Sequence, residues 1–573
     1  MNMLKKFFIG LVNWKQNKPM VDWLLGLAKS YRKYILGFLA INFVTMLISL
    51  GSAVASRYVV DAATGFQSGL FYRYILIMLV ASVLSIVIAT VSGMFSSYVS
   101  EKFSFGIRVD LFNRVQRSVW HKLSKFHSGD LLSRLAGDVD TISGTLISVI
   151  PNVLVTGIQL VLVLFLLLSN DPTLALIALI VGPLGVLSSI FFRKQYTKYQ
   201  EKLRQSHSEY FSFLQETMAS IGVVKTFQLE DGKIQQLENI RNHRLWLVMR
   251  SARLSNIMGA LMRLIYSIGY VVTFSWCAYQ LSTNAAYTYG TMTLFLALVS
   301  QVQGSIRTLG GVVPQIFNLM VSAKRLYQIT ELENEDYTPR DGQPNTLSVE
   351  VKNLEFRYDD EVEDRYVLKN LNFRIPAGVR VGVVGASGAG KTTFIRLLLA
   401  LIKPTVGQVC YVDENGKPEE ACPASRRFIS YVPQGNTLLT GSVRTNLLAG
   451  NPDATEEQMW QALEQADAAS FLRKSPKGLD TVLAESAGGL SEGQAQRISI
   501  ARALLRDRPV LILDEATSAL DENTEARIFQ RISNLKGKTC FIITHRKSML
   551  RYCDMLLTID AEGHATLTQS ETL

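Results

Sequence analysis

Cysteine is scarce in this sequence, and its few cysteines form no motif. None of them belongs to a CxxC pair, and the set is Cys277, Cys410, Cys422, Cys540 and Cys553. A disulfide scaffold needs an even framework of cysteines, and a cysteine zinc site needs closely spaced pairs. The sequence therefore argues against both classes and indicates a reducing compartment.

Acidic residues are also in deficit, but the excess of basic residues is not the patch of a nucleic-acid-binding protein. Lys and Arg number 59 against 48 Asp and Glu, which gives a net charge of +11. Most of this excess lies between long apolar runs, as in the cytoplasmic loops of membrane proteins. We therefore predict no nucleic-acid partner and expect contact with membrane lipid.

A cleavable signal peptide is not evident at the N-terminus. Residues 1–33 mix lysines with Phe and Trp and lack a small-residue cleavage site. This composition predicts an amphipathic elbow at the membrane surface, with a basic tail as the alternative.

Six stretches between residues 34 and 330 reach the roughly 20 apolar residues that span a bilayer. They are Ile35–Ser56, Tyr74–Phe95, Leu146–Leu168, Leu174–Phe192, Ile257–Leu281 and Tyr289–Val313. The two longest connections, 96–145 and 193–256, are rich in Lys and Arg, which places them and both termini in the cytoplasm. Their helical polar patterning predicts that the membrane helices continue into the cytoplasm.

Polar side chains inside a span are costly and mark candidate substrate pathways. Here they are Arg263, Gln301, Gln303 and Arg307. Gln303 and Arg307 would share a helix face and line a water-filled cavity. The alternative is that both arginines lie near the cytoplasmic ends and extend to the lipid headgroups.

A polar linker at 331–344 separates this region from residues 345–573, where strand-like and helical stretches alternate as in an α/β domain. Within this domain, a glycine-rich loop follows the apolar strand 379–384 and precedes a helical run, which is the context of a P-loop. The loop consists of Gly385, Ala386, Ser387, Gly388, Ala389, Gly390, Lys391, Thr392 and Thr393. Its backbone N–H groups would surround the phosphates of ATP, with Lys391 on the β- and γ-phosphates and Thr392 on Mg²⁺.

A second apolar strand, 510–514, ends in two carboxylates. Strand tips are where nucleotide sites lie in open α/β sheets. Asp514 is therefore a candidate Mg²⁺ ligand, and Glu515 is a candidate base for the attacking water.

The segment Leu490-Ser491-Glu492-Gly493-Gln494 resembles the signature sequence of ATP-binding-cassette (ABC) transporters. Four other positions match that family in order. Tyr358 resembles the aromatic residue that stacks on adenine, Gln434 the glutamine that senses Mg²⁺ and the γ-phosphate, Asp521 the D-loop aspartate, and His545 the switch histidine.

The membrane half carries the resemblance too. Residues 128–140 and 215–227 resemble the first and second intracellular loops of exporter-type members. The resemblance implies an all-α six-helix transmembrane domain followed by an α/β P-loop ATPase domain. It implies a half-transporter that exports a drug, lipid or peptide by alternating access. A half-transporter this compact is more typical of a bacterial plasma membrane than of an organelle.

The resemblance also implies a dimer, because Ser491, Gly493 and Asp521 would act on ATP held by the P-loop of a second half-transporter. Glu515 and His545 are both present, which favours a homodimer over a heterodimer. Two departures from the family pattern favour a different partner chain: Glu492 in the signature, and the missing Arg-Gly after Glu485. An importer of exporter-like fold, for example for a metal chelate, and an ATP-gated channel remain the alternative functions.

Overall fold

The computed structural model of the chain describes residues 14–65, 68–284, 287–338, 342, 344–358, 366–435, 437–483 and 490–570. The chain divides into two compact units. The first consists of Met1–Asn113 and Ser128–Glu331, and the second consists of Arg114–His127 and Leu332–Leu573. Unlike the sequence-based division, the structure therefore groups residues 114–127 with the C-terminal unit.

The first unit is helical. Its helices are α2 (Trp14–Ser30), α3 (Arg32–Thr64), α4 (Ser68–Arg117, whose last turn belongs to the second unit), α6 (Ser128–Ser133), η1 (Arg134–Asp138), α7 (Val139–Gly144), η2 (Thr145–Val149), α8 (Ile150–Asn170), α9 (Pro172–Ala219), α10 (Ile221–Thr226), α11 (Glu230–Thr283) and α12 (Tyr289–Thr330). Five of the predicted spans lie within α3, α4, α9, α11 and α12. The remaining span begins in the π-helical segment η2 and continues through α8.

Four stretches of the described residues are long and apolar enough to cross a membrane: Arg32–Thr64, Gly69–Arg117, Ser128–Asn170 and Glu230–Thr283. Pro172–Leu184 is a shorter apolar stretch. In the most apolar window of α4 only 6% of the residues are buried inside the chain, so most of its apolar side chains face outward. This is the arrangement expected of a helix surrounded by lipid.

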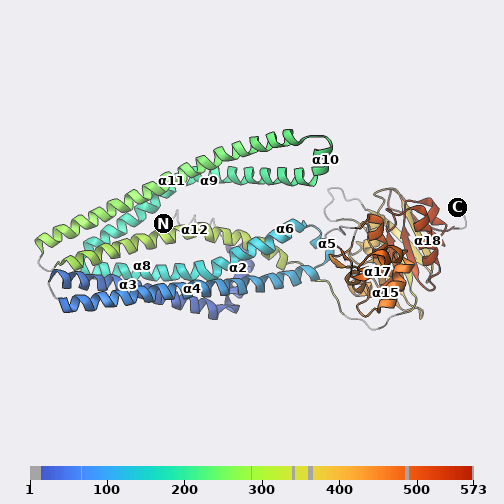
Figure 1. Cartoon of the computed structure of the whole chain (residues 1–573). Helices are drawn as coiled ribbons and strands as arrows, with labels where there is room; N and C mark the ends of the chain where they lie inside the picture. The colour runs from blue at the N-terminus through green and yellow to red at the C-terminus, as the bar shows by residue number, and fades with distance from the viewer. Residues whose placement is uncertain are drawn as a thin grey trace. The chain divides into compact units, whose positions relative to one another are not determined.

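Three helices of the first unit are far longer than a bilayer requires. α4, α9 and α11 contain 50, 48 and 54 residues, whereas about 20 residues cross the hydrocarbon core. Figure 1 shows α9 and α11 side by side with α10 at their shared end, and the two helices are in extensive contact. The predicted continuation of the membrane helices beyond the apolar spans is confirmed.

The second unit contains two principal sheets. The six-stranded sheet has the order β12 (Ala565–Gln569), β11 (Met555–Ile559), β3 (Arg380–Gly385), β10 (Thr539–Ile543), β9 (Val510–Asp514) and β6 (Ile429–Val432). The four-stranded antiparallel sheet has the order β2 (Leu368–Ile375), β1 (Ser348–Phe356), β4 (Val406–Val412) and β5 (Pro418–Glu420). A small pair joins β7 (Gly441–Ser442) to β8 (Val482–Leu483).

The helices of this unit are α5 (Trp120–Leu123), α13 (Lys391–Leu398), η3 (Pro423–Phe428), α14 (Val443–Leu448), α15 (Glu456–Gln465), α16 (Ala469–Lys474), η4 (Gly478–Asp480), α17 (Glu492–Arg506), α18 (Glu522–Ser533) and α19 (Lys547–Leu550). Every residue of β9 and β10 is buried, which explains their unbroken apolar sequences. β3, β10, β9 and β6 run parallel, so their carboxyl ends meet at one edge of the sheet. That edge carries the candidate site.

The predicted linker is anchored to the second unit over residues 333–337. Glu335 accepts hydrogen bonds from Arg426 Nη1 and Nη2 at 2.6 and 2.9 Å, and its backbone N–H donates to Arg117 at 2.7 Å. Burial works against the charge of Glu335, but the hydrogen bonds and charge of Arg426 hold the pKa of Glu335 below its usual value. The first turn after α12 is therefore fixed by a buried ion pair rather than left free.

Candidate active site

The P-loop joins β3 to α13, as the sequence predicted. Gly390 has φ +99°, and a Cβ there would lie 2.9 Å from the side chain of Leu368, so both conformation and space require glycine. Lys391 is buried, and its Nζ donates to the carbonyls of Gly385 and Ala386 at 2.8 and 3.0 Å. The amine is thereby held within the loop that would receive the phosphates.

Asp514 is the last residue of β9, two strands from the P-loop strand. Its carboxylate is buried and accepts one long hydrogen bond, 3.4 Å, from the Tyr431 hydroxyl. Burial raises the pKa of Asp514, and the adjacent Glu515 raises it further. A buried carboxylate with so little hydrogen bonding suits a divalent cation, and Thr392, which is exposed at the start of α13, offers a hydroxyl.

Glu515 is held by the two other side chains that the sequence singled out at this edge. Gln434 Nε2 donates to Oε2 at 2.6 Å, and His545 Nε2 lies 2.9 Å from Oε1. Glu515 adopts φ +47°, a conformation uncommon outside glycine, asparagine and aspartate. Strain of this kind concentrates at functional sites because the surrounding structure must enforce it.

The aromatic residue expected to stack on adenine is attached to the P-loop helix. The Tyr358 hydroxyl lies 3.2 Å from Thr393 Oγ1 and accepts a hydrogen bond from Arg396 Nη1 at 3.2 Å. The Arg396 guanidinium also lies 4.9 Å from the centre of the Trp120 ring, in a cation–π contact. Trp120 belongs to α5, between the predicted second and third spans, so this contact joins residues distant in sequence.

Sequence reasoning missed Arg396 and Trp120. The only signal was spacing, because Thr393 and Arg396 are three residues apart and share a face of α13. Nothing in the sequence indicates that Trp120 contacts that face.

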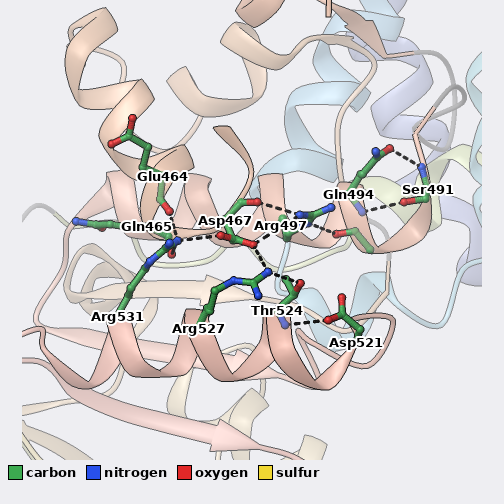
Figure 2. A network of polar contacts seen from close by, with 11 residues as sticks. Glu464, Gln465, Asp467, Ser491, Gln494, Arg497, Asp521, Thr524, Arg527 and Arg531 are labelled. Carbon is green, nitrogen blue, oxygen red and sulfur yellow. Dashed lines mark hydrogen bonds and ion pairs between the residues drawn. The ribbon is translucent and has the colours of Figure 1, made fainter. Parts of the chain in front are cut away.

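The signature and D-loop residues lie at the starts of two helices. Ser491 caps α17, accepting from Gln494 N at 3.3 Å while its own N–H donates to Gln494 Oε1 at 3.0 Å. Asp521 caps α18 by accepting from Thr524 N at 3.0 Å (Figure 2). A Cβ on Gly493 would lie 2.9 Å from the Ala519 carbonyl oxygen, so the signature packs directly against the D-loop.

The two departures from the family pattern differ in what the structure shows. Glu492 occupies the first turn of α17, where a negative charge is favourable to the helix dipole. The segment that follows Glu485 lies outside the described residues.

The candidate pathway residues do not form one cluster. Gln301 accepts from Gln159 of α8 at 3.3 Å, whereas Gln303 donates to the Tyr266 carbonyl of α11 at 3.4 Å. Arg263 and Arg307 are both exposed. The structure thus directs the two glutamines toward different helices.

The first intracellular-loop motif forms a network of ion pairs with α12. Arg134 pairs with Asp130 at 2.8 Å, and Arg325 pairs with Asp130 at 2.7 Å and with Asp138 at 2.8 Å. Ser322 also donates to Asp138 at 2.8 Å. These residues fix α6 and η1 against the last turns of α12.

Comparison with known proteins gives family matches in both halves of the chain. Residues 34–306 match the ABC transporter transmembrane region, and residues 368–518 match the ABC transporter family. An ATP-dependent lipid A-core flippase from Syntrophus aciditrophicus is 30% identical over 81% of this chain and 77% of its own length. A putative multidrug export ATP-binding/permease protein from Staphylococcus aureus is 29% identical over 82% of each chain.

The structure of a bacterial Atm1-family ABC exporter with ATP bound superimposes with a TM-score of 0.79. That superposition covers 94% of this chain and 95% of the other at 23% identity, so it concerns the fold alone.

Proposed function

This chain belongs to the ABC transporter family, as a half-transporter of the exporter type, and we propose that two copies of it form an ATP-driven exporter in a bacterial plasma membrane. It has a helical transmembrane domain followed by an ABC ATPase domain, and it is a multi-pass membrane protein. Half-transporters of this type work as dimers. The identity of the partner and the direction of transport belong to the proposal.

The observation that carries the proposal is the convergence of Glu515, Gln434 and His545 at the strand edge beside the P-loop. Glu515 is positioned to accept a proton from the attacking water, and Gln434 and His545 hold its two carboxylate oxygens. Lys391 and the loop amides would bind the phosphates. A complete set of these groups in one chain supports a homodimer.

The residues at this edge fit Mg²⁺, with Asp514, Thr392 and Gln434 as its proposed ligands. Bound there, the cation would neutralise charge that develops on the transferred phosphoryl group. A cation there would offset the burial that raises the pKa of Asp514. Tyr358 would stack on the adenine ring through its exposed face.

ATP binding is proposed to favour the closed dimer over the open one, because Ser491, Gly493 and Asp521 of each chain would complete the partner's site. A ligand shifts a conformational equilibrium only by its difference in affinity for the two states. Hydrolysis would remove that difference and return the dimer to the open state. The Asp130–Arg134–Asp138–Arg325 network would transmit the motion into α12.

The substrate belongs to a class still to be assigned. The relatives named above handle a lipid A-core and multiple drugs, which makes amphipathic lipids and drugs the first substrates to test. The relative from Staphylococcus aureus is named for export, which favours an exporter over the importer and channel alternatives.

The test is ATP hydrolysis by the purified chain in lipid vesicles, compared with Glu515→Gln. Removing a general base costs about 10²–10⁴-fold in rate, so Glu515→Gln should retain at most about 1% of the activity. Glu522→Gln, an exposed acid in the first turn of α18, serves as the matched control and should keep full activity.

A silent wild-type chain would refute the homodimer and require a second protein. ATP-dependent uptake of amphipathic drugs or lipids into inside-out vesicles would support export. Flux in both directions without hydrolysis would instead identify a channel.

A further inference from the structure

Asp467 occupies a backbone position at which glycine is the most common residue. Helix α15 ends in a Schellman motif, in which Ala468 N donates to the Leu463 carbonyl at 2.7 Å and Asp467 N donates to the Glu464 carbonyl at 3.0 Å. Asp467 is the left-handed residue of this motif, with φ +56°. Glycine is the usual residue there because it has no Cβ. An aspartate that departs from this local preference suggests a role for its side chain.

The Asp467 side chain is surrounded by arginines from two other helices. Arg527 of α18 donates to Oδ2 at 2.8 Å, and Arg531 of α18 donates to Oδ1 at 3.3 Å. Arg497 of α17 donates to the Asp467 backbone carbonyl at 2.9 Å (Figure 2). The carboxylate is mostly buried, with 19% of its side chain exposed. Asp467 thus joins α15, α17 and α18 at one point.

Helices α17 and α18, which meet at Asp467, are capped at their starts by Ser491 and Asp521, residues expected to act on ATP held by the partner chain. Arg497 Nε also donates to the Gly493 carbonyl at 3.3 Å, and Arg527 also donates to Thr524 Oγ1 at 2.8 Å. Thr524 is in turn capped by Asp521. Contacts therefore run from the signature glycine through Asp467 to the D-loop aspartate.

A second connection joins the same two segments. The buried amide of Gln496 donates to Ser518 Oγ at 3.0 Å and accepts from Ala519 N at 3.1 Å. This clamp fixes the D-loop to α17 directly. Asp467 adds a further connection between α17 and α18, because it contacts Arg497, the residue after Gln496, and also the two arginines farther along α18.

We propose that Asp467 is a positioning residue, which sets the signature motif and the D-loop at the spacing that two chains need to enclose ATP. The proposal rests on the proposed dimeric function. It assigns Asp467 no contact with nucleotide, because its contacts are with the arginines of α17 and α18. Losing the carboxylate should therefore impair the dimer-dependent step and leave nucleotide binding to the chain's own P-loop unchanged.

Asp467→Asn is the appropriate variant, because asparagine tolerates the left-handed conformation as well as aspartate does. The variant removes the negative charge and replaces one of the two oxygens that accept from Arg527 and Arg531 with an amide nitrogen. We expect kcat for ATP to fall about three- to tenfold, which lies within the roughly two- to thirtyfold range by which mutations in coupled networks change communication between sites. The affinity of the purified chain for fluorescent ADP, which reports P-loop binding, should not change.

Glu464→Gln is the matched control. Glu464 lies in the last turn of α15, and its side chain pairs with Arg473 at 2.5 Å. The substitution therefore removes an ion pair from the same surface, but within the described residues the side chain it changes makes no hydrogen bond or ion pair with α17 or α18. Arg527→Gln, at a side chain that is 49% exposed, should reproduce the Asp467→Asn effect, and the double variant should be little worse than either single variant.

Hydrogen exchange gives a readout that does not depend on activity. In ADP-bound protein, Asp467→Asn should speed amide exchange at residues 491–494 and 518–521 together. Unchanged exchange there, an unchanged kcat beside an active wild type, or a parallel loss of ADP affinity would each overturn the proposal. A silent wild type would refute the homodimer instead, while the exchange comparison would still decide the role of Asp467.

Discussion

Replacing Arg396 with methionine tests whether the P-loop helix positions the adenine-binding aromatic. Methionine retains most of the side-chain volume but removes the charge. It deletes the hydrogen bond to the Tyr358 hydroxyl at 3.2 Å and the cation–π contact with Trp120 at 4.9 Å. Trp120, Tyr358 and Arg396 are all half-buried, so each of the two contacts is weaker than the same contact would be in a fully buried site.

The two contacts together should amount to about 1–1.5 kcal/mol, from about 0.5 kcal/mol for the cation–π pair and about 0.5–1 kcal/mol for the hydrogen bond. If Tyr358 stacks on adenine, this loss should weaken ATP binding about five- to tenfold. Equilibrium binding of a fluorescent ATP analogue, measured in the Glu515→Gln background to prevent hydrolysis, gives the affinity directly.

Arg473→Met provides the control, because Arg473 makes the same kind of contact with Trp460 at 5.2 Å but lies in α16. It should bind ATP as the parent does. Tyr358→Phe should weaken binding to a similar extent, and its effect should not add fully to that of Arg396→Met. Wild-type affinity in both Arg396→Met and Tyr358→Phe would refute the reasoning.

Two further predictions concern packing and pH. Gly493→Ala should lower the free energy of unfolding by about 1–3 kcal/mol, because the new Cβ would lie 2.9 Å from the Ala519 carbonyl oxygen. The melting temperature should fall, and an unchanged melting temperature would contradict this packing. Glu335→Gln should lower stability at pH 7, because the pKa of Glu335 is depressed by Arg426 in the folded chain. That stabilisation is fully present above the unfolded pKa near 4.5 and is lost as the pH falls through the lower pKa of the folded chain. The difference in melting temperature between variant and wild type should therefore disappear in acid, and a difference independent of pH would contradict the ion pair.

The parts of the site that were predictable are those in which function depends on local sequence. The P-loop needs glycines at fixed spacing between a strand and a helix, and Gly390 shows why, with its positive φ and crowded Cβ. Asp514 and Glu515 were found because an apolar run that ends in two acids marks the tip of a buried strand. The membrane helices were predictable because bilayer thickness fixes the length of an apolar run.

Partners across the fold were not predictable in the same way. Gln301 and Gln303 are two residues apart, yet they hydrogen-bond to α8 and α11, because a helix turns by about 200° over two residues. The sequence placed 331–344 as a linker without indicating that Glu335 would be buried against Arg426. Such contacts depend on which distant segments the fold brings together.

The order of the two domains and the positions of the long apolar helices could be read from the sequence, since both depend on composition and short-range spacing. The roles of the nucleotide-site residues stay predictions. Tertiary structure alone decided that Trp120 contacts Arg396, that Gln434 and His545 both hold Glu515, and that Asp467 joins three helices. These contacts connect residues that are 30 to 276 positions apart in the chain. Their formation depends on the packing of whole elements, which no local pattern specifies.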